Sequence, residues 1–274
     1  PPLCMNPEIS RRAFLRTGAA AGTAALATVS AGVRLAAVEP FVRTGAPRLR
    51  LSLAAYSFRD DFRVPKGAAA GSVPKMDMFK FLDYCAEQGC EGAELTSYYF
   101  EDPATDEYLQ RVKRHAHVRG VTVSGSAVGN TFTHPPGPQR DKEVAGVKRW
   151  IERAAVLGAP HIRVFAGNAQ SGQSRADAVR HCVAALDECA AYAGKYGIFL
   201  GIENHGGIVS TPDELIEVVK ASNSPWVGVN LDTGNFHGED PYEDLARCVR
   251  KMPDTADHVR NFHQVVVDNN CVIV

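Results

Sequence analysis

The chain has 274 residues, of which 45% are apolar and 22% are charged, and its formal net charge at pH 7 is −1. This composition is typical of a soluble globular protein, and the length allows one large domain or two ordinary ones. A domain that binds a nucleic-acid backbone usually has a clear basic excess or stripe, so the near-neutral charge argues against a nucleic-acid partner.

The N-terminal segment, residues 1–45, has the pattern of an export signal and linker. Met5 is a plausible start, paired arginines follow, and an apolar run rich in Ala and Gly comes next. Residues 10–15 (SRRAFL) resemble the twin-arginine signal, which directs folded proteins out of the cytoplasm. Polar residues interrupt the apolar run, so we expect a cleaved signal rather than a membrane anchor, and a periplasmic or extracellular protein.

From residue 49 onward, short apolar or β-branched runs alternate with longer amphipathic ones. The short runs predict strands and the long runs predict helices, because their apolar residues recur at the corresponding periods. Thr211 and Pro212 fit the N-cap and first position of one such helix. The predicted strands are 49–58, 92–100, 121–132, 161–168, 198–207 and 226–236, and the predicted helices are 76–89, 106–120, 143–158, 175–197, 211–222 and 241–252.

Strands separated by helices imply parallel pairing through right-handed crossovers, and this number of units favours an α/β protein of the (β/α)8 TIM-barrel type. An open doubly wound sheet is the alternative, but no GxGxxG or Walker-type loop is present. Residues 258–267 can supply a seventh strand. Few residues follow it, so we expect a barrel domain over 46–274 that is truncated after about seven βα units.

The seven cysteines form no CxxC pair and no zinc-finger spacing. Cys182 and Cys189 lie on one predicted helix and are too far apart for a disulfide bond to each other. We therefore expect the cysteines to be small apolar core residues.

Polar residues gather at the C-terminal ends of the predicted strands, where TIM barrels carry their reactive groups. They are Tyr56, Ser57, Glu94, Thr96, Asn130, His134, Asn168, Glu203, Asn204, His205, Asp232, Asn235 and His237.

Glu203 and Asp232 form the best pair in this set. Each ends an apolar strand in the same phase, so adjacent parallel strands would bring two acids to the same mouth. Two carboxylates that converge repel each other unless a cation or a proton lies between them. A divalent metal bound by carboxylate and imidazole groups is the simplest solution.

The motifs "GIENHGG" and "VNLDTGNF", with "LAAYSF" and "GAELTSYYF" at the first two strands, resemble the sugar phosphate isomerase/epimerase-like family with the xylose isomerase-like barrel fold. The resemblance implies one divalent ion, Mn, Mg, Co or Zn, held by Glu, Asp, His and Glu on the fifth to eighth strands. Glu203 and Asp232 match the first two ligands. His258 is preferred over His263 for the third, and the eighth-strand Glu has no counterpart.

The resemblance also implies proton abstraction next to the carbonyl of a sugar or keto-sugar, through an enediolate. Glu203 or a neighbouring base would move the proton, and His205, also at the catalytic centre, would contact substrate hydroxyls or orient metal-bound water. The residues expected to bind the substrate are Tyr56, Glu94, Asn130, Asn204 and His237.

Three other functions remain open from sequence. A lyase or hydrolase could use the same metal and enediolate on keto-sugars. An endonuclease-like phosphodiesterase shares the barrel fold but binds two or three zinc ions through more His and Glu ligands. A non-catalytic exported sugar-binding protein is compatible with a barrel that lacks the eighth strand. An exported enzyme would meet free or oxidised sugars rather than phosphorylated ones, and a homo-oligomer is compatible with the sequence.

Overall fold

Strands and helices alternate along the chain in the predicted order. The computed structural model describes residues 50–251, 262–267 and 271–273, with side chains described for residues 50–249. The strands are β1 Leu51–Ala54, β2 Gly92–Thr96, β3 Thr122–Ala127, β4 His161–Phe165, β5 Phe199–Glu203, β6 Val227–Asp232, β7 Phe262–Val267 and β8 Cys271–Ile273. The helices are α2 Met78–Glu87, α3 Asp106–Val118, α4 Pro138–Leu157, α5 Arg175–Ala193, α6 Pro212–Ala221 and α7 Pro241–Lys251.

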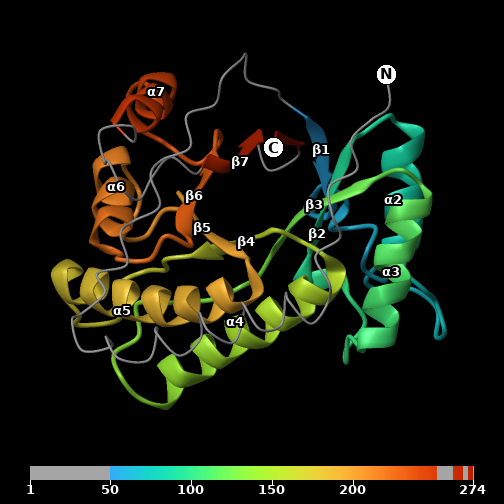
Figure 1. Ribbon diagram of the computed structural model, residues 1–274, viewed down its shortest axis with the longest axis horizontal. Helices are drawn as coiled ribbons and strands as arrows, with labels where there is room; N and C mark the ends of the chain where they lie inside the picture. The colour runs from blue at the N-terminus through green and yellow to red at the C-terminus, as the bar shows by residue number, and fades with distance from the viewer. Residues whose placement is uncertain (1–49, 252–261, 268–270, 274) are drawn as a thin grey trace, which may run out of the picture. The chain divides into compact units, whose positions relative to one another are not determined.

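The described strands form a closed ring in the order β1 to β8 (Figure 1). Neighbours from β1 to β7 pair in parallel, as the βα alternation predicts. The last strand, β8, is antiparallel to both β7 and β1 and lies between them. The prediction of a TIM-type barrel is confirmed, and an antiparallel strand of three residues occupies the place of the eighth parallel strand.

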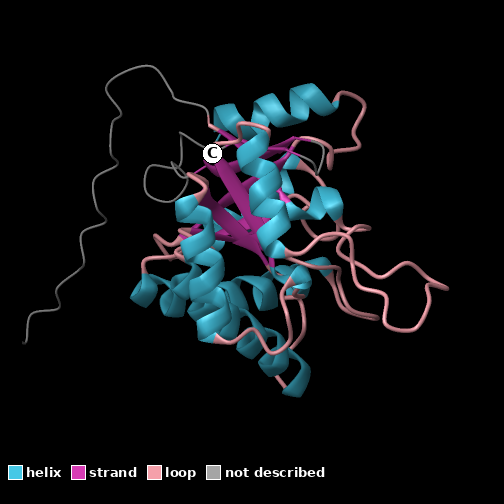
Figure 2. Ribbon diagram, turned by 90° about the vertical axis from the view of Figure 1, so that its right-hand side faces the viewer, coloured by secondary structure: helices cyan, strands magenta, loops and turns pink. Residues whose placement is uncertain are grey.

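The helices surround the strands, and the main apolar core lies between the two layers (Figure 2). Side chains of a strand alternate between its faces, so every second residue points outward to the helices. On β5 the outward residues are Leu200 and Ile202, which are fully buried and belong to the same apolar core as helix residues such as Leu186. The outer wall of this strand is therefore apolar.

Helix starts follow the side chains that cap them. Thr211 and Glu214 form a capping box at α6, with Pro212 in the first turn as the sequence predicts. Helix α4 begins at Pro138, earlier than the predicted residue 143, because Gly137 serves as the N-cap and proline is well tolerated in the first turn.

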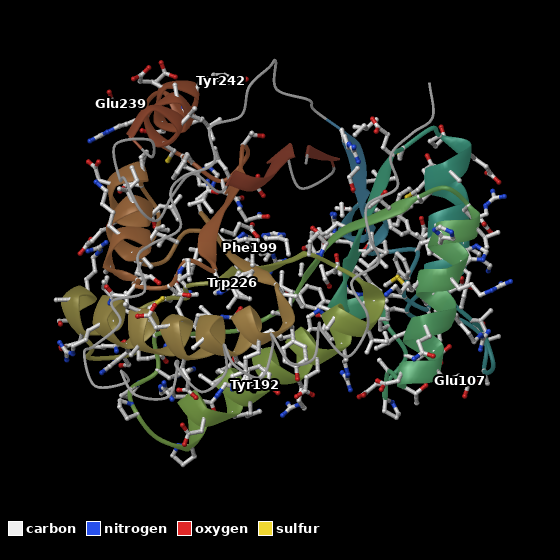
Figure 3. All side chains as sticks on the ribbon, in the orientation of Figure 1. Glu107, Tyr192, Phe199, Trp226, Glu239 and Tyr242 are labelled. Carbon is white, nitrogen blue, oxygen red and sulfur yellow. The ribbon has the colours of Figure 1, made fainter. Side chains whose placement is uncertain are left out.

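Two aromatic rings pack together at the N-terminal ends of β5 and β6 (Figure 3). The rings of Phe199 and Trp226 have centroids 4.8 Å apart. A Cβ atom at Gly194 would lie 2.4 Å from the indole nitrogen of Trp226, so only glycine leaves room for this ring. The contact fixes the end of the barrel opposite the polar mouth.

Cys85, Cys182, Cys189 and Cys248 are buried, as expected for small core residues. Burial raises the pKa of Cys182 to about 12, so its thiol stays uncharged at neutral pH. In the part of the chain that the structure describes, no helix combines the length and apolar character needed to cross a membrane. The predicted signal and linker, residues 1–45, lie outside the described residues.

Candidate active site

The strand faces that point into the barrel carry polar side chains, whereas the faces that point toward the helices are apolar. On β4 the inward set contains His161, Arg163 and Phe165, and on β6 it contains Asn230 and Asp232. The strand register places Glu203 level with Phe165 on one side and with Asn230 on the other. A row of functional side chains therefore crosses three neighbouring strands.

A cavity of about 250 Å³ opens inside the barrel at this level, and we call it the inner cavity. Its wall combines charged and amide groups with three aromatic rings. The lining residues are Ala54, Tyr56, Glu94, Thr96, Tyr98, Arg163, Phe165, Glu203, His205 and Asn230. Tyr56 and Glu94, both predicted from sequence to bind substrate, thus lie in one cavity with Glu203.

Three N–H donors hold the Glu203 carboxylate. Arg163 Nε lies 2.7 Å from Oε2, and both side chains are at least 90% buried. His205 Nδ1 and Asn235 Nδ2 lie 2.9 Å and 3.0 Å from Oε1. Because the acceptor is a carboxylate, the proton of this hydrogen bond belongs to Nδ1 of His205, and Nε2 remains for other partners.

These contacts set the charge of Glu203. Burial raises the pKa of its carboxyl, but the Arg163 guanidinium, His205 and Asn235 together outweigh burial and lower the pKa below its usual value. The hydrogen bond to Glu203 in turn raises the pKa of His205. Glu203 is therefore ionised at neutral pH although it is buried, which is the state a base requires.

Arg163 fills the space between the barrel wall and Glu203. Its Nη1 donates to the carbonyl oxygen of Val128 at 3.0 Å, and its guanidinium lies 3.9 Å from the centre of the Phe165 ring. Burial lowers its pKa, but Glu203, Tyr98 and Glu94 together outweigh burial and raise the pKa, so the side chain is always charged. The carbonyl oxygen of Val128 and the ring of Phe165 therefore hold the guanidinium in position for its ion pair with Glu203.

Glu94 is a second buried acid of the inner cavity, and its Oε1 accepts a hydrogen bond of 2.9 Å from Thr96. Asp232 ends β6 and is fully buried, and its Oδ1 accepts the N–H of Gly234 at 2.8 Å. The adjacent strands β5 and β6 thus bring Glu203 and Asp232 to the same end of the barrel, as their common phase predicts.

Asn204 and Asn130 each connect the ends of two strands. The amide of Asn204 donates to the carbonyl oxygen of Asp232 and accepts from its N–H, at 2.9 Å and 2.7 Å. Asn130 makes the same two bonds with the backbone of Phe165, at 2.7 Å and 2.9 Å. Both were predicted to bind substrate, which stays a prediction, and both have a structural use in addition.

A second cavity of about 430 Å³, the outer cavity, adjoins the first and shares Phe165, Glu203 and His205 with it. Its other wall is the loop that follows β4. That loop is held by hydrogen bonds from Thr133 to Asn168 and from Gln173 to Thr133. The outer cavity is lined by Asn130, Thr131, His134, Phe165, Ala166, Gly167, Asn168, Ala169, Gln170, Ser171, Glu203, His205, Gly206 and Val209.

Two predicted site residues, His237 and His258, are not found among the described side chains that line the two cavities. His237 is exposed on the loop after β6 and lines neither cavity. His258, the preferred third metal ligand, lies outside the described residues, and the side chain of His263 on β7 is also outside them. Their predicted roles stay predictions.

Sequence reasoning missed Arg163 and Asn230. Both lie inside strands, two residues before a strand's C-terminal end. The alternation of β4 offered a signal, because a charged side chain in an apolar strand points toward a partner.

The donor types of this mouth fit a divalent cation. Carboxylate oxygens and imidazole nitrogens suit Mn, Mg, Co and Zn. The Oε2 atom of Glu203 accepts one N–H, from Arg163, which leaves a lone pair for a metal. Within the described residues no group of three or more His, Cys, Asp or Glu side chains is close enough to hold a metal ion.

Residues 82–267 match the family described as xylose isomerase-like TIM barrel. No curated protein matches the chain. Many solved structures are similar in fold. Protein SMc04130 from Sinorhizobium meliloti 1021 is 19% identical, with a TM-score of 0.59, over 76% of this chain and 70% of that one.

Two further solved structures are similar in fold. D-Psicose 3-epimerase from Clostridium cellulolyticum H10, solved with D-tagatose, is 16% identical, with a TM-score of 0.60, over 72% of this chain and 68% of that one. The IolI protein, solved with a bound zinc atom, is 17% identical, with a TM-score of 0.55, over 69% of this chain and 64% of that one. At these identities the similarity establishes the fold alone.

Proposed function

Because the chain belongs to the xylose isomerase-like TIM barrel family, we propose that it is a sugar isomerase or epimerase that transfers a proton next to a carbonyl. The observation that carries the proposal is the buried, ionised Glu203 in a cavity lined by aromatic and hydrogen-bonding side chains. The similar fold of a sugar epimerase, D-psicose 3-epimerase, supports the same reaction class.

The inner cavity suits a sugar. Tyr56, Tyr98 and Phe165 give it apolar surfaces that can pack against the C–H faces of a sugar, and Glu94 and Thr96 offer acceptors for hydroxyl groups. Such a mixture of aromatic walls and a few polar groups is typical of small-molecule sites.

Glu203 would remove the proton from the carbon next to the carbonyl. Arg163 keeps this carboxylate charged and in place, and Asn235 fixes its orientation with a second hydrogen bond. His205 lines both cavities, so its Nε2 could donate a proton to the developing enediolate oxygen while Nδ1 stays bonded to Glu203. His205 Nε2 would then take the proton of the neighbouring hydroxyl as that oxygen becomes the new carbonyl. Glu203 would return its proton to the former carbonyl carbon, which completes the isomerisation.

Glu203 and Asp232, with His258 as the predicted third ligand, would hold one divalent ion. When bound, the ion polarises the carbonyl and hydroxyl oxygens of the substrate. We expect metal analysis of protein purified without chelator to find about one equivalent of Mn, Mg, Co or Zn for such a three-ligand site. A Glu203→Ala, Asp232→Ala variant should lose it, and an Asp177→Ala variant on the surface should keep it. An unchanged metal content in the double variant would rule out this site, and two or three zinc ions would favour a phosphodiesterase.

The reaction itself can be tested by hydrogen exchange. Ketoses incubated with the protein in deuterated water should gain deuterium at the carbon next to the carbonyl, which proton NMR detects as a lost signal. Binding of a sugar without exchange would contradict the enzyme and favour a sugar-binding protein.

The export signal is a further proposal, since residues 10–15 lie outside the described part of the chain. Fractionation of cells that make the chain should find it outside the cytoplasm, and Arg11→Lys with Arg12→Lys should retain it inside. Equal export of both forms would contradict a twin-arginine signal.

A further inference from the structure

Asn230 is a buried amide without a hydrogen-bond partner in the part of the chain that the structure describes. The residue is 0% exposed, and neither its Oδ1 nor its Nδ2 forms a hydrogen bond there. A polar group that loses water on folding and gains no partner destabilises the protein, so native structures leave few such groups without a reason. The amide of Asn230 therefore needs an explanation outside these contacts.

The other two buried asparagines of the barrel mouth make the contrast plain. Asn130 and Asn204 each donate one hydrogen bond and accept one from the backbone of the neighbouring strand. Their amides are needed to hold the strand ends together. Asn230 has the same side chain at a similar depth, yet among the described residues it holds no strand or loop in this way.

The side chain of Asn230 lies on the wall of the inner cavity, together with Arg163 and Glu203. Its Cα is in register with that of Glu203 on the adjacent strand, so a ligand that reaches the Glu203 carboxylate from the cavity also passes the amide. The amide of Asn230 thus borders the place where a substrate would bind.

The charge of the cavity restricts what this ligand can be. An amide needs a partner that accepts from Nδ2 and donates to Oδ1, and a hydroxyl group does both, whereas a phosphate or carboxylate only accepts. Glu94 would also repel an anion. The two cationic groups of the wall, Arg163 and His205, already pair with Glu203. The ligand end in this cavity is therefore uncharged and hydroxylated.

We propose that Asn230 is a substrate-binding residue that recognises a hydroxyl group, and that the inner cavity selects the uncharged end of a free sugar over a phosphorylated or acidic end. This inference rests on the proposed function for the identity of the substrate, and on the contacts of Asn230 for the role of the amide.

The first test needs no ligand. Replacing Asn230 with leucine, which has a similar shape and no polar atoms, should leave the melting temperature within about 2 °C of the wild type or raise it, because no hydrogen bond is lost. Asn204→Leu is the matched control and should melt roughly 4 to 8 °C lower, because two backbone hydrogen bonds are lost. A comparable drop in Asn230→Leu would overturn the proposal, since it would mean that the amide serves the fold, for example through a bound water.

The second test measures recognition with defined probes. D-Fructose and D-tagatose, their 6-phosphates and D-gluconate are compared by calorimetric titration of the wild type and Asn230→Leu. We expect the free ketoses to bind the wild type best, and Asn230→Leu to bind them about tenfold to a hundredfold more weakly. Tighter binding of the phosphates or of gluconate, equal binding by the variant, or no binding of either ketose to the wild type would each overturn the proposal.

Failure of the two proposals can be told apart. A protein that binds ketoses through Asn230 but causes no deuterium exchange would disprove the isomerase and leave the role of Asn230 intact. If the wild type and Asn230→Leu bind ketoses equally and exchange deuterium at the same rate, the role of Asn230 is disproved and the isomerase stands.

Discussion

The two faces of the same strands are built from opposite kinds of residue. On β5, Leu200 and Ile202 face the helices and belong to the apolar core, whereas Glu203 faces the barrel axis and carries a charge. The outer face contributes stability through apolar burial. The inner face places polar groups where they cost stability unless they are paired, so it is the face on which chemistry is built.

The largest expected effect is on the inner face, at Glu203. Glu203→Gln keeps the shape of the side chain and removes the charge, so deuterium exchange into a ketose should fall by about a hundredfold to ten-thousandfold. Glu239→Gln, at an exposed residue labelled in Figure 3, is the control and should exchange at the wild-type rate. If Glu203→Gln exchanged deuterium at the wild-type rate, a residue other than Glu203 would be the base.

A smaller effect, on stability, should follow from breaking the buried ion pair. Arg163→Met leaves the buried Glu203 carboxylate without its cation, which should lower the free energy of unfolding by about 3 to 5 kcal/mol. Urea denaturation measures this difference. The double variant with Glu203→Gln should lose less than the sum of the single variants, because the two side chains act as one unit. Additive losses would contradict the coupling.

The outer face should respond through packing alone. Leu186 on α5 is fully buried in the core, so Leu186→Ala should lower the free energy of unfolding by about 2 to 5 kcal/mol. Deuterium exchange by the folded fraction should be unchanged. If this variant lost exchange while still folded, the division between a stabilising outer face and a reactive inner face would fail.

The smallest effect is expected at the end of a helix, away from both faces. Thr211→Ala removes one half of the capping box of α6 and should cost about 1 kcal/mol of unfolding free energy. Thr211→Ser, which retains the hydroxyl group, is the control. A loss much larger than this would indicate that the start of α6 supports the neighbouring mouth.

The sequence was sufficient to predict the fold because the period of apolar residues changes between strands and helices. It also placed Glu203 and Asp232 at one mouth, since both end strands in the same phase. It could not supply Arg163 or Asn230, because the ion pair of Arg163 and the burial of Asn230 arise only when the folded barrel brings neighbouring strands together. The start of α4 was misplaced for a local reason, a glycine and a proline that replace the usual N-cap.

The hydrogen bonds that the side-chain amides of Asn130 and Asn204 make with the backbone affect how the loops at this end of the barrel can vary. Each side chain acts as one additional rung of a strand ladder, placed just beyond the point where the backbone ladder ends. The spacing of the strand ends is therefore secured before the loops begin. Insertions and deletions in those loops could remodel what enters the barrel and leave the catalytic spacing undisturbed, which is the condition under which a single scaffold acquires new substrates.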